Sequence, residues 1–412
     1  MTSYRAARDA MAAGLYPYFL PLTGHEGTTV TLGDQELVMC GSNNYLGLTA
    51  DPRVKKAAAE ALDLYGTSCT GSRFLNGNLA LHDLLEEELA DFYGKPAAAV
   101  FSTGYQANLG VISALAGRGD LVFADRDAHA SIVDGTVLSG AKLRRFPHND
   151  AAALDRRLAD APEGSGRLVV VDGVYSMEGD LCVLPELVSA SRRHGARIVV
   201  DDAHGLGVLD GGRGTAAHFG LVDQVDLITV TFSKSLASLG GAVVGSEEVI
   251  HYLKHHARSL IFSASATPAS AAAALAALRI LRAEPWRAEK AQENAAYVRR
   301  GLARLGVSSG ASSTPVVPLR TRGVVETLLL WRRLVDRGVY TNPVLPPAAS
   351  PRLRLSFMAT HTTDHLDRVL EALAAETDMF LGPDEPDGPG QDTDPGEAAG
   401  LAELAAAART RP

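Results

Sequence analysis

Cysteine is scarce in this chain of 412 residues, which has only Cys40, Cys69 and Cys182. An odd number of cysteines cannot pair completely, and their wide spacing matches no metal-binding motif, so we expect free thiols in a reducing compartment. Basic charge is also short, with 39 lysines and arginines against 48 acidic residues. The resulting net charge of −9 argues against a nucleic-acid binder, which usually presents a basic face.

Long apolar runs are missing too. No stretch approaches the roughly 18 apolar residues of a membrane-spanning helix. The N-terminal segment MTSYRAARDAMAAGLYPYFL lacks the unbroken apolar centre of a signal peptide. Hydrophobic residues nevertheless make up 46% of the chain, as in a globular protein with a sizeable core. We therefore expect a cytoplasmic enzyme.

Short apolar segments alternate with helical patterns over residues 97–245. This alternation predicts an α/β fold in which helices flank a mostly parallel central sheet. The expected strands are residues 97–101, 120–124, 168–171, 197–200 and 226–231, and the expected helices are 108–116, 130–139, 184–194 and 216–220. Helical periodicity also covers 52–65 and 79–93, where the acidic cluster Glu86-Glu87-Glu88 is typical of a solvated face. Residues 246–300 are predicted to be largely helical.

The patterns divide the chain into four parts. We expect an N-terminal arm over residues 1–45, a large domain over 46–282, a small C-terminal α/β domain over 283–382, and a tail over 383–412. The tail is acidic and rich in proline and glycine. Such a composition buries too little apolar surface to fold, so we expect the tail to be disordered and without a catalytic role.

The segment DLITVTFSKSLASLGG, residues 226–241, joins an apolar strand to a single lysine, Lys234. A lysine at the end of a buried strand is costly to desolvate unless its amine is neutral or covalently engaged. Thr231, Ser233 and the glycine pair offer the small polar surfaces that a phosphate-bearing cofactor needs. The segment favours a Schiff-base lysine that binds pyridoxal 5′-phosphate (PLP), although a surface lysine in a Ser/Gly loop fits it as well.

Another predicted strand ends in Asp201-Asp202-Ala203-His204. An aspartate at the end of a buried strand needs a cationic partner, and the pyridinium nitrogen of PLP is one. His204 can reach the phenolic oxygen of the same ring. A metal site is the alternative, but the cluster has no further ligands nearby in sequence. A dinucleotide site is disfavoured because no acidic residue follows Gly205-x-Gly207 at the required spacing.

Three further segments follow predicted strands. The turn at residues 102–108, STGYQAN, offers first-turn N–H groups to a phosphate, or is an ordinary helix cap. His129 can stack on an aromatic cofactor or cap a helix, and the segment from Asp172 to Asp180 is an acidic loop. Because open α/β sheets bind ligands at the carboxyl ends of their strands, the turn, Asp201 and Lys234 together predict one PLP site.

With these residues in place, the chain resembles the α-oxoamine synthases, a family of PLP enzymes of fold-type I (aspartate aminotransferase-like), over about residues 5–381. The matching blocks are SNNYLGL (42–48), TGSRFLNG (70–77), STGYQANLG (102–110), DAHASIVDG (127–135), DGVYSMEGD (172–180), VDDAHGLGV (200–208) and TFSKSLASLGG (231–241). The second and last blocks are most similar to the bacterial serine palmitoyltransferase branch. The 2-amino-3-ketobutyrate CoA ligases and 8-amino-7-oxononanoate synthases belong to the same group.

The resemblance implies a role for each matched residue. Lys234 would hold PLP covalently and exchange the Cα proton, while Asp201 and His204 would pair with the ring nitrogen and the phenolate oxygen. His129 would stack on the ring and help to place the substrate carboxylate. Contacts to the phosphate and ring are implied for Gly104, Tyr105, Asp172, Ser176, Thr231 and Ser233. Asn43 and Arg354 would hold the amino-acid carboxylate, and Ser265 and Thr267 would reach the phosphate from the partner subunit of a homodimer.

The sequence departs from the family pattern at two places, which limits how many of the family's residue roles apply to this chain. Asp172 stands where many relatives carry glutamate, so its contact is shorter by one methylene. Leu345 replaces a threonine that the oxononanoate enzyme uses, and no clear arginine is present for a dicarboxylic acyl group. The lack of such an arginine weakens the pimeloyl and succinyl alternatives.

The activity that the resemblance implies is a decarboxylative Claisen condensation of a small L-amino acid with an acyl thioester. Serine and a long-chain acyl-CoA are the first expectation, while alanine, glycine or glutamate, and an acyl carrier protein as donor, stay open. The basic cluster from His251 to Arg258 could meet an acidic carrier, or be a solvated helix face. A PLP aminotransferase is an alternative, as is a scaffold subunit without PLP, which the presence of Lys234 disfavours.

Overall fold

The computed structural model describes residues 6–346 and 348–381, so the acidic tail lies outside the described residues. The chain forms two compact units, which we treat separately. The large unit contains Asn44–Tyr175 and Asp180–Glu289, and the small unit contains the described parts of Met1–Asn43, Ser176–Gly179 and Lys290–Pro412. The boundaries expected for the arm and the two domains stay a prediction.

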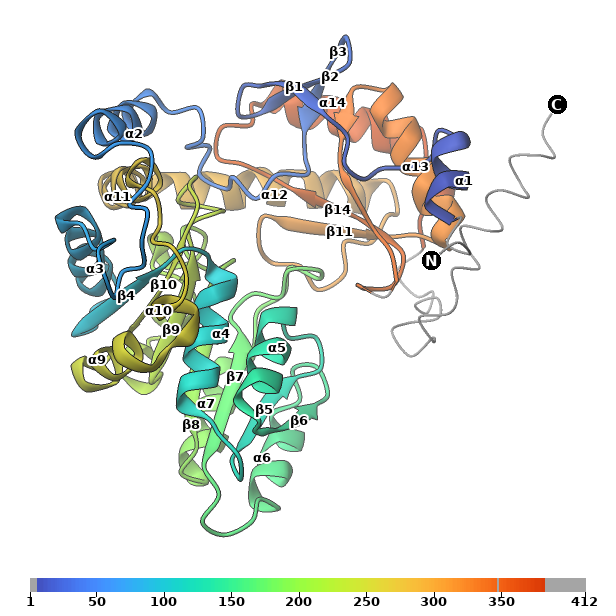
Figure 1. Cartoon of the computed structure of the whole chain (residues 1–412). Coiled ribbons are helices and arrows are strands. Elements are labelled where there is room, and N and C mark those ends of the chain that lie inside the picture. Colours follow the sequence, from blue (N-terminus) through green and yellow to red (C-terminus); the bar gives the residue numbers. More distant parts are fainter. Residues whose placement is uncertain (1–5, 347, 382–412) are drawn as a thin grey trace. The chain divides into compact units, whose positions relative to one another are not determined.

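A mixed sheet organises the large unit (Figure 1). Within the described chain it has seven strands, in the order β4-β10-β9-β8-β7-β5-β6. The four neighbouring pairs from β9 to β6 are parallel, whereas β10 runs antiparallel to both β4 and β9. The strands are β4 (Ala97–Phe101), β5 (Leu121–Asp125), β6 (Lys142–Phe146), β7 (Arg167–Asp172), β8 (Arg197–Asp201), β9 (Leu227–Thr231) and β10 (Gly241–Gly245).

Helices bury both faces of this sheet, because successive strand residues point to opposite sides. In β8, Ile198 and Val200 pack on one face and Val199 on the other. The first face is covered by α2 (Pro52–Tyr65), α3 (Ala80–Tyr93), α6 (Ala151–Ala159), α7 (Leu184–Arg193) and α11 (Pro268–Ala283). The second is covered by α4 (Gly104–Leu115), α5 (Ala130–Ser139), α9 (Glu247–His256) and α10 (Arg258–Ile261). The short helix α8 (Thr215–His218) completes the unit.

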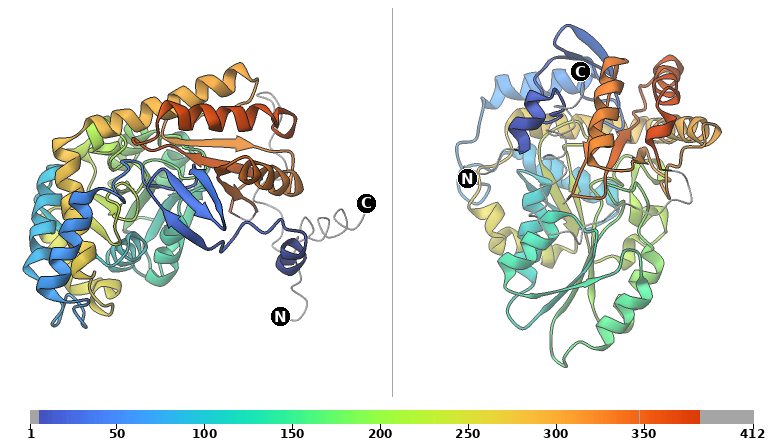
Figure 2. Two further views of the ribbon diagram at one scale, coloured as in Figure 1. Left: turned by 90° about the horizontal axis from the view of Figure 1, so that it is seen from above. Right: turned by 90° about the vertical axis from the view of Figure 1, so that its right-hand side faces the viewer.

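The small unit has its own core. One sheet pairs β1 (Leu22–His25), β2 (Thr29–Leu32), β3 (Gln35–Met39) and β12 (Val339–Tyr340), and another pairs β11 (Val316–Arg320), β14 (Arg352–Ser356) and β13 (Asn342–Val344). Figure 2 shows these strands with α12 (Trp286–Arg304), α13 (Val324–Asp336) and α14 (Thr363–Ala374) around them. The N-terminal helix α1 spans Ala6–Ala12. No helix of the described residues combines the length and apolar character needed to cross a bilayer.

Most expected elements of the large unit form within a residue or two of their predicted ends, but three were not predicted: β6, α6 and β10. The segment KLRRF of β6 is an edge strand exposed along much of its length, so it carries little apolar pattern. The helix predicted from residue 108 begins at Gly104, where Thr103 caps it. The helix predicted over 216–220 is the single turn α8.

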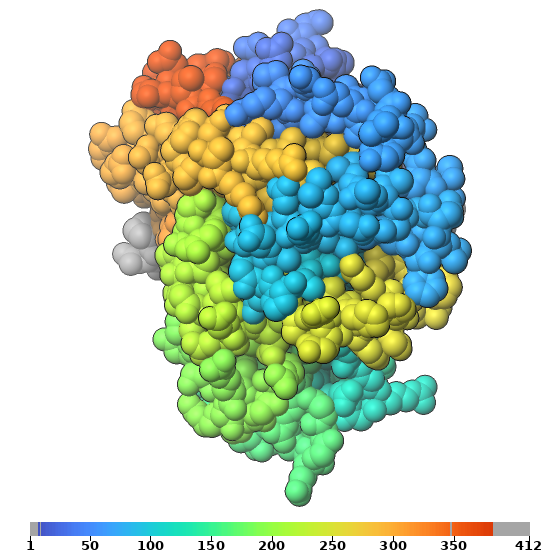
Figure 3. Space-filling view, turned by 90° about the vertical axis from the view of Figure 1, so that its left-hand side faces the viewer, coloured from blue at the N-terminus to red at the C-terminus, as the bar shows by residue number. Residues whose placement is uncertain are grey.

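The prediction that Glu86 lies on a solvated face is wrong. Its side chain is only 6% exposed, whereas Glu87 is exposed. Oε1 accepts a hydrogen bond from the backbone of Val100 at 2.8 Å and forms an ion pair with Arg73 at 2.9 Å, and Oε2 accepts a hydrogen bond from Lys254 at 2.5 Å. Glu86 therefore connects α3 to β4 and to α9. The surfaces of α3 (light blue) and α9 (yellow) adjoin in Figure 3.

Replacing Glu86 by alanine should lower the free energy of unfolding by about 3–5 kcal/mol, because it leaves the buried Arg73 facing no carboxylate at that position. Urea unfolding followed by fluorescence measures the loss. The matched control is Glu87→Ala on the exposed face, which should change stability by no more than about 0.5 kcal/mol. Equal effects of the two variants would contradict the buried ion pair.

Candidate active site

Polar side chains gather in a cavity of about 250 Å³ in the large unit. The cavity lies at the carboxyl ends of β7, β8 and β9, which is where open α/β sheets bind ligands. It is lined by Thr103, Gly104, Tyr105, Asn108, His129, Ser131, Asp172, Asp201, Ala203, His204, Thr229, Val230, Thr231, Ser233, Lys234 and Leu239. Nine of the predicted site residues are thus brought together, from five different strand ends and helix starts.

Asp201 is held rigidly at the end of β8. The residue is 6% exposed, and its Oδ2 accepts a hydrogen bond from Nδ2 of Asn108 at 2.6 Å while Oδ1 accepts one from the backbone N–H of Ala203 at 3.0 Å. Asn108 is itself fixed by the hydroxyl of Thr229, which donates to its Oδ1 at 2.7 Å. A buried, preoriented carboxylate of this kind suits a cationic ring nitrogen.

The adjacent Asp202 has different partners. Both its oxygens accept from the backbone N–H of Thr215 at 3.1 Å, and Oδ1 also accepts from the Thr215 hydroxyl at 2.6 Å. Burial is the main cause that raises the pKa of Asp202 to about 6. Because Asp201 and Asp202 serve separate hydrogen-bond networks, their adjacency gives the metal alternative no further support.

His129 caps α5 and lines the cavity. Its backbone N–H donates to Oδ2 of Asp172 at 3.1 Å, and its Nδ1 lies 2.7 Å from the Ser131 hydroxyl. Burial lowers the pKa of His129. A neutral, flat imidazole held in this way can stack on an aromatic ring without carrying a charge into the pocket.

Lys234 lies just beyond β9, among hydroxyl groups and close backbone approaches. The Thr231 and Ser233 hydroxyls are 2.8 Å apart. A Cβ on Gly104 would come within 2.7 Å of Thr231 Cβ, and one on Gly241 within 2.5 Å of Gly104 N, so both glycines are needed for this packing. The first turn of α4 therefore lies directly against the hydroxyl cluster, where its N–H groups can receive a phosphate.

His204 is buried and lines the same cavity. Its Nδ1 lies 2.7 Å from the hydroxyl of Tyr45, which fixes the orientation of the imidazole. PLP requires a particular set of groups, and the cavity contains them: an aspartate, a lysine, two imidazoles and a helix start with hydroxyls. The residues present fit that cofactor.

Asn43, Ser176 and Arg354 lie in the small unit. Arg354 is 5% exposed, and its Nη1 donates to Oδ1 of Asn43 at 3.0 Å while its Nε donates to the carbonyl of Ser176 at 2.5 Å. The structure thus brings the two residues expected to hold a carboxylate into contact. Ser176, in the same unit, takes part through its backbone carbonyl, which accepts the hydrogen bond from Arg354.

Ser265 and Thr267 are not among the residues that line the cavity within the described chain. The Ser265 hydroxyl donates to the carbonyl of Gly77 at 2.7 Å, and Thr267 caps α11 through Ser270. The predicted contact of these two residues with a phosphate concerns a partner subunit, and it stays a prediction.

Two contacts of the site were not singled out from the sequence, those of Asn108 with Asp201 and of Tyr45 with His204. Both residues lie inside blocks that match the family, STGYQANLG and SNNYLGL. Their partners are 93 and 159 residues away along the chain, so only the fold reveals them.

A larger cavity, of about 570 Å³, lies at the opposite ends of the strands. Its lining includes Arg167, Arg197 and Leu227, the first residues of β7, β8 and β9. Size alone would favour this cavity. The smaller one contains the lysine, the histidines and the buried aspartates, so the chemistry lies there.

Comparison with known proteins shows the family of the chain. A family model described as aminotransferase class I and II matches residues 35–373. A serine palmitoyltransferase of Sphingobacterium spiritivorum is 47% identical over 377 residues, which are 90% of this chain and 94% of that protein. An 8-amino-7-oxononanoate synthase of Geobacter metallireducens is 45% identical over 371 residues, 88% of this chain and 95% of that protein.

Solved structures give the same result and confirm the fold predicted from the sequence. Serine palmitoyltransferase of Sphingomonas wittichii matches with a TM-score of 0.87 and 37% identity, over 90% of this chain and 95% of that one. A high-resolution serine palmitoyltransferase that holds PLP as its internal aldimine matches with a TM-score of 0.87 and 36% identity, over the same shares. The chain therefore belongs to the aminotransferase class I and II family and, within it, to the α-oxoamine synthases, acyltransferases that use PLP bound to a lysine.

Proposed function

We propose that this chain condenses a small L-amino acid with an acyl thioester, releasing CO₂ and a free thiol and forming an α-aminoketone. The observation that carries the proposal is the single cavity that contains Lys234, Asp201 and His129. L-serine is the first candidate, because relatives 47% identical are serine palmitoyltransferases. Alanine, glycine and glutamate are the other amino acids to test.

Bound PLP supplies an electron sink that stabilises a carbanion at the amino-acid Cα. Asp201, fixed by Asn108, would hold a proton on the ring nitrogen and so keep that sink effective. Lys234 would hold the cofactor and would remove and return the Cα proton. His129 would cover one face of the ring, and His204 would pair with the phenolate oxygen. The phosphate would be held by Gly104, Tyr105, Thr231 and Ser233.

An acyl-CoA is the donor that we favour over an acyl carrier protein. The basic cluster from His251 to Arg258 is partly used within the chain, since Lys254 pairs with Glu86 at 2.5 Å and Arg258 lies 4.8 Å over the ring of Phe262.

The unpaired cysteines, Cys40, Cys69 and Cys182, fit a reducing compartment, and we propose a cytoplasmic setting.

The function is tested by an absorbance titration of purified holoenzyme with L-serine, L-alanine, glycine and L-glutamate, with and without palmitoyl-CoA. We expect L-serine alone to shift the cofactor band, and CO₂ and free thiol to form only when the thioester is added. Lys234→Ala should abolish turnover and covalent cofactor binding, while Lys55→Ala on the exposed side of α2 should change neither. A keto acid with pyridoxamine phosphate would instead identify an aminotransferase.

Arg354 should determine affinity for the amino acid. Arg354→Lys keeps the positive charge but loses the planar fork that binds a carboxylate through two hydrogen bonds, so we expect the amino-acid KM to rise about tenfold or more. The thioester KM should not change. Arg352→Lys, on the same strand and paired with Glu178, is the control. If both variants raise the amino-acid KM equally, Arg354 does not contact the carboxylate.

We also propose that the enzyme is a homodimer. Two segments of the large unit carry exposed apolar side chains, with Phe74 50% exposed, Leu75 77% and Phe262 72%. Their segments adjoin, because Ser265 donates to Gly71 and Gly77. Large exposed apolar clusters of this kind mark interfaces.

The double variant Leu75→Glu, Phe262→Glu should shift the mass measured by light scattering from dimer to monomer, because it places charges in an apolar contact. Turnover should fall with it if Ser265 and Thr267 serve the partner's site. Trp286→Glu, at a side chain 51% exposed outside this cluster, should leave the dimer intact. A wild-type monomer would refute the proposal.

A further inference from the structure

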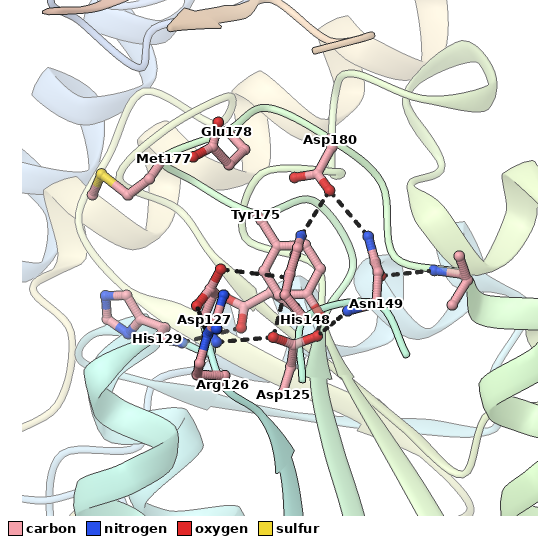
Figure 4. A network of polar contacts seen from close by, with 12 residues as sticks. Asp125, Arg126, Asp127, His129, His148, Asn149, Tyr175, Met177, Glu178 and Asp180 are labelled. Carbon is pink, nitrogen blue, oxygen red and sulfur yellow. Dashed lines mark hydrogen bonds and ion pairs between the residues drawn. The ribbon is translucent and has the colours of Figure 1, made fainter. Parts of the chain in front are cut away.

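A cluster of charged side chains lies beside the cofactor cavity without lining it, and His148 is at its centre (Figure 4). His148 lies between β6 and α6. Its Nδ1 is 3.1 Å from Oδ1 of Asp125, and its Nε2 is 2.9 Å from Oδ2 of Asp180. Both ring nitrogens thus face carboxylates. Only the doubly protonated, cationic ring can donate to both.

Asp125 organises the segment that leads to His129. It is the last residue of β5, and its Oδ1 also accepts from the backbone N–H of Asp127 at 2.8 Å. Its Oδ2 accepts from the Asn149 backbone at 2.8 Å and the Tyr175 hydroxyl at 2.9 Å. The Asp125 carboxylate therefore fixes the backbone of residues 126–128, and His129 follows directly.

Asp180 organises the return of the loop that follows β7. Its Oδ2 accepts from Nδ2 of Asn149 at 3.0 Å as well as from His148, and its carbonyl accepts from the Tyr175 backbone at 3.0 Å. This loop begins at Asp172, which accepts from the backbone N–H of His129. The segments after β5 and β7 are consequently joined at two points, one at His148 and one at the edge of the cavity.

We propose that His148 is a positioning residue: as a cation it clamps the segment after β5 to the segment after β7 and so fixes the His129 ring over the cofactor. Without this cation, Asp125, Asp127 and Asp180 would face one another, and their repulsion would separate the segments. The inference rests on the proposed function only for the role of His129 at the PLP ring.

The charge of His148 follows from its surroundings. The titratable groups that face it are Asp125 at the end of β5, Asp127 in the following segment, and Asp180 and Tyr175 beyond β7, with Arg126 paired to Asp127. Burial alone would lower the pKa of His148, but the hydrogen bonds to Asp125 and Asp180 outweigh it and raise the pKa to about 10. A raised pKa means that the stabilisation is complete below about pH 6.5 and is lost as the pH rises towards 10.

The first test compares His148→Gln with His194→Gln in the holoenzyme. His194, at the end of α7, is a matched control. Its side chain is 19% exposed against 20% for His148, and its Nε2 lies 2.9 Å from Oδ1 of Asp155. We expect His148→Gln to weaken the circular dichroism of the bound cofactor, which reports how rigidly the ring is held, and to lower kcat about 10–100-fold. His194→Gln should change neither. Lost stability with an unchanged cofactor signal and kcat would make His148 merely structural and overturn the proposal.

A milder variant, Asp180→Asn, keeps the size of the side chain and removes one charge, so it covers the case in which His148→Gln does not fold. NMR titration of ring-labelled histidine should show the wild-type His148 charged to beyond pH 8. In Asp180→Asn its pKa should fall by about one to three pH units, and the cofactor signal should then weaken over the same pH range. A neutral wild-type His148, or a cofactor signal independent of its titration, would refute the clamp. Because neither readout requires condensation, a failure of the proposed activity would be recognised separately.

Discussion

Buried negative charge at the carboxyl edge of the large sheet is the constraint on which the site depends. Asp172 and Asp201 end neighbouring parallel strands and lie opposite each other in register, both nearly inaccessible to solvent. Burial and the charge of Asp201 raise the pKa of Asp172. Positive charge opposes this effect: Lys234 lines the cavity, and the ring nitrogen of bound PLP would add a second positive charge. Cofactor binding and the stability of this edge are therefore coupled, since a ligand that binds only the folded state stabilises it.

Pairing of a buried carboxylate with a cation recurs elsewhere in the chain. Glu86 is buried against Arg73 and Lys254, and the carboxylates of Asp125 and Asp180 share His148. Each buried carboxylate meets a cation from a segment distant in sequence. Removing one partner of such a group leaves an uncompensated charge, which costs more than the pair contributes. Long-range ion pairs thus specify how the loops at the site are arranged, beyond any net stability that they add.

Sequence reasoning succeeded where the signal is local. Helix α2 has its predicted ends because Asp51 caps it, Pro52 occupies its first turn and Gly66 ends it. The central strands β7, β8 and β9 were recognised as apolar runs, and the polar residues at their ends gave most of the cavity. Strand β10, GAVVG, was missed because two glycines flank a very short apolar run, and the polar edge strand β6 was missed because it has little to bury.

What could not be predicted depends on contacts between distant residues. An acidic cluster such as Glu86-Glu87-Glu88 is typical of a solvated face, and Lys254, which pairs with the buried Glu86, is 168 residues away. His148 occurs in an unremarkable HND sequence, and its importance follows only from strands β5 and β7 being neighbours in the sheet.

Similarity in sequence does not by itself select the substrate. Relatives at 47% and 45% identity bear the names of enzymes that make different products, so the residues shared by all of them cannot choose the amino acid. The cavity at the strand ends supplies groups that PLP chemistry needs whatever the substrate. The small unit supplies Arg354 with Asn43, which we propose to hold the α-carboxylate that every candidate amino acid carries. The residues that distinguish one amino acid from another therefore lie outside this shared set.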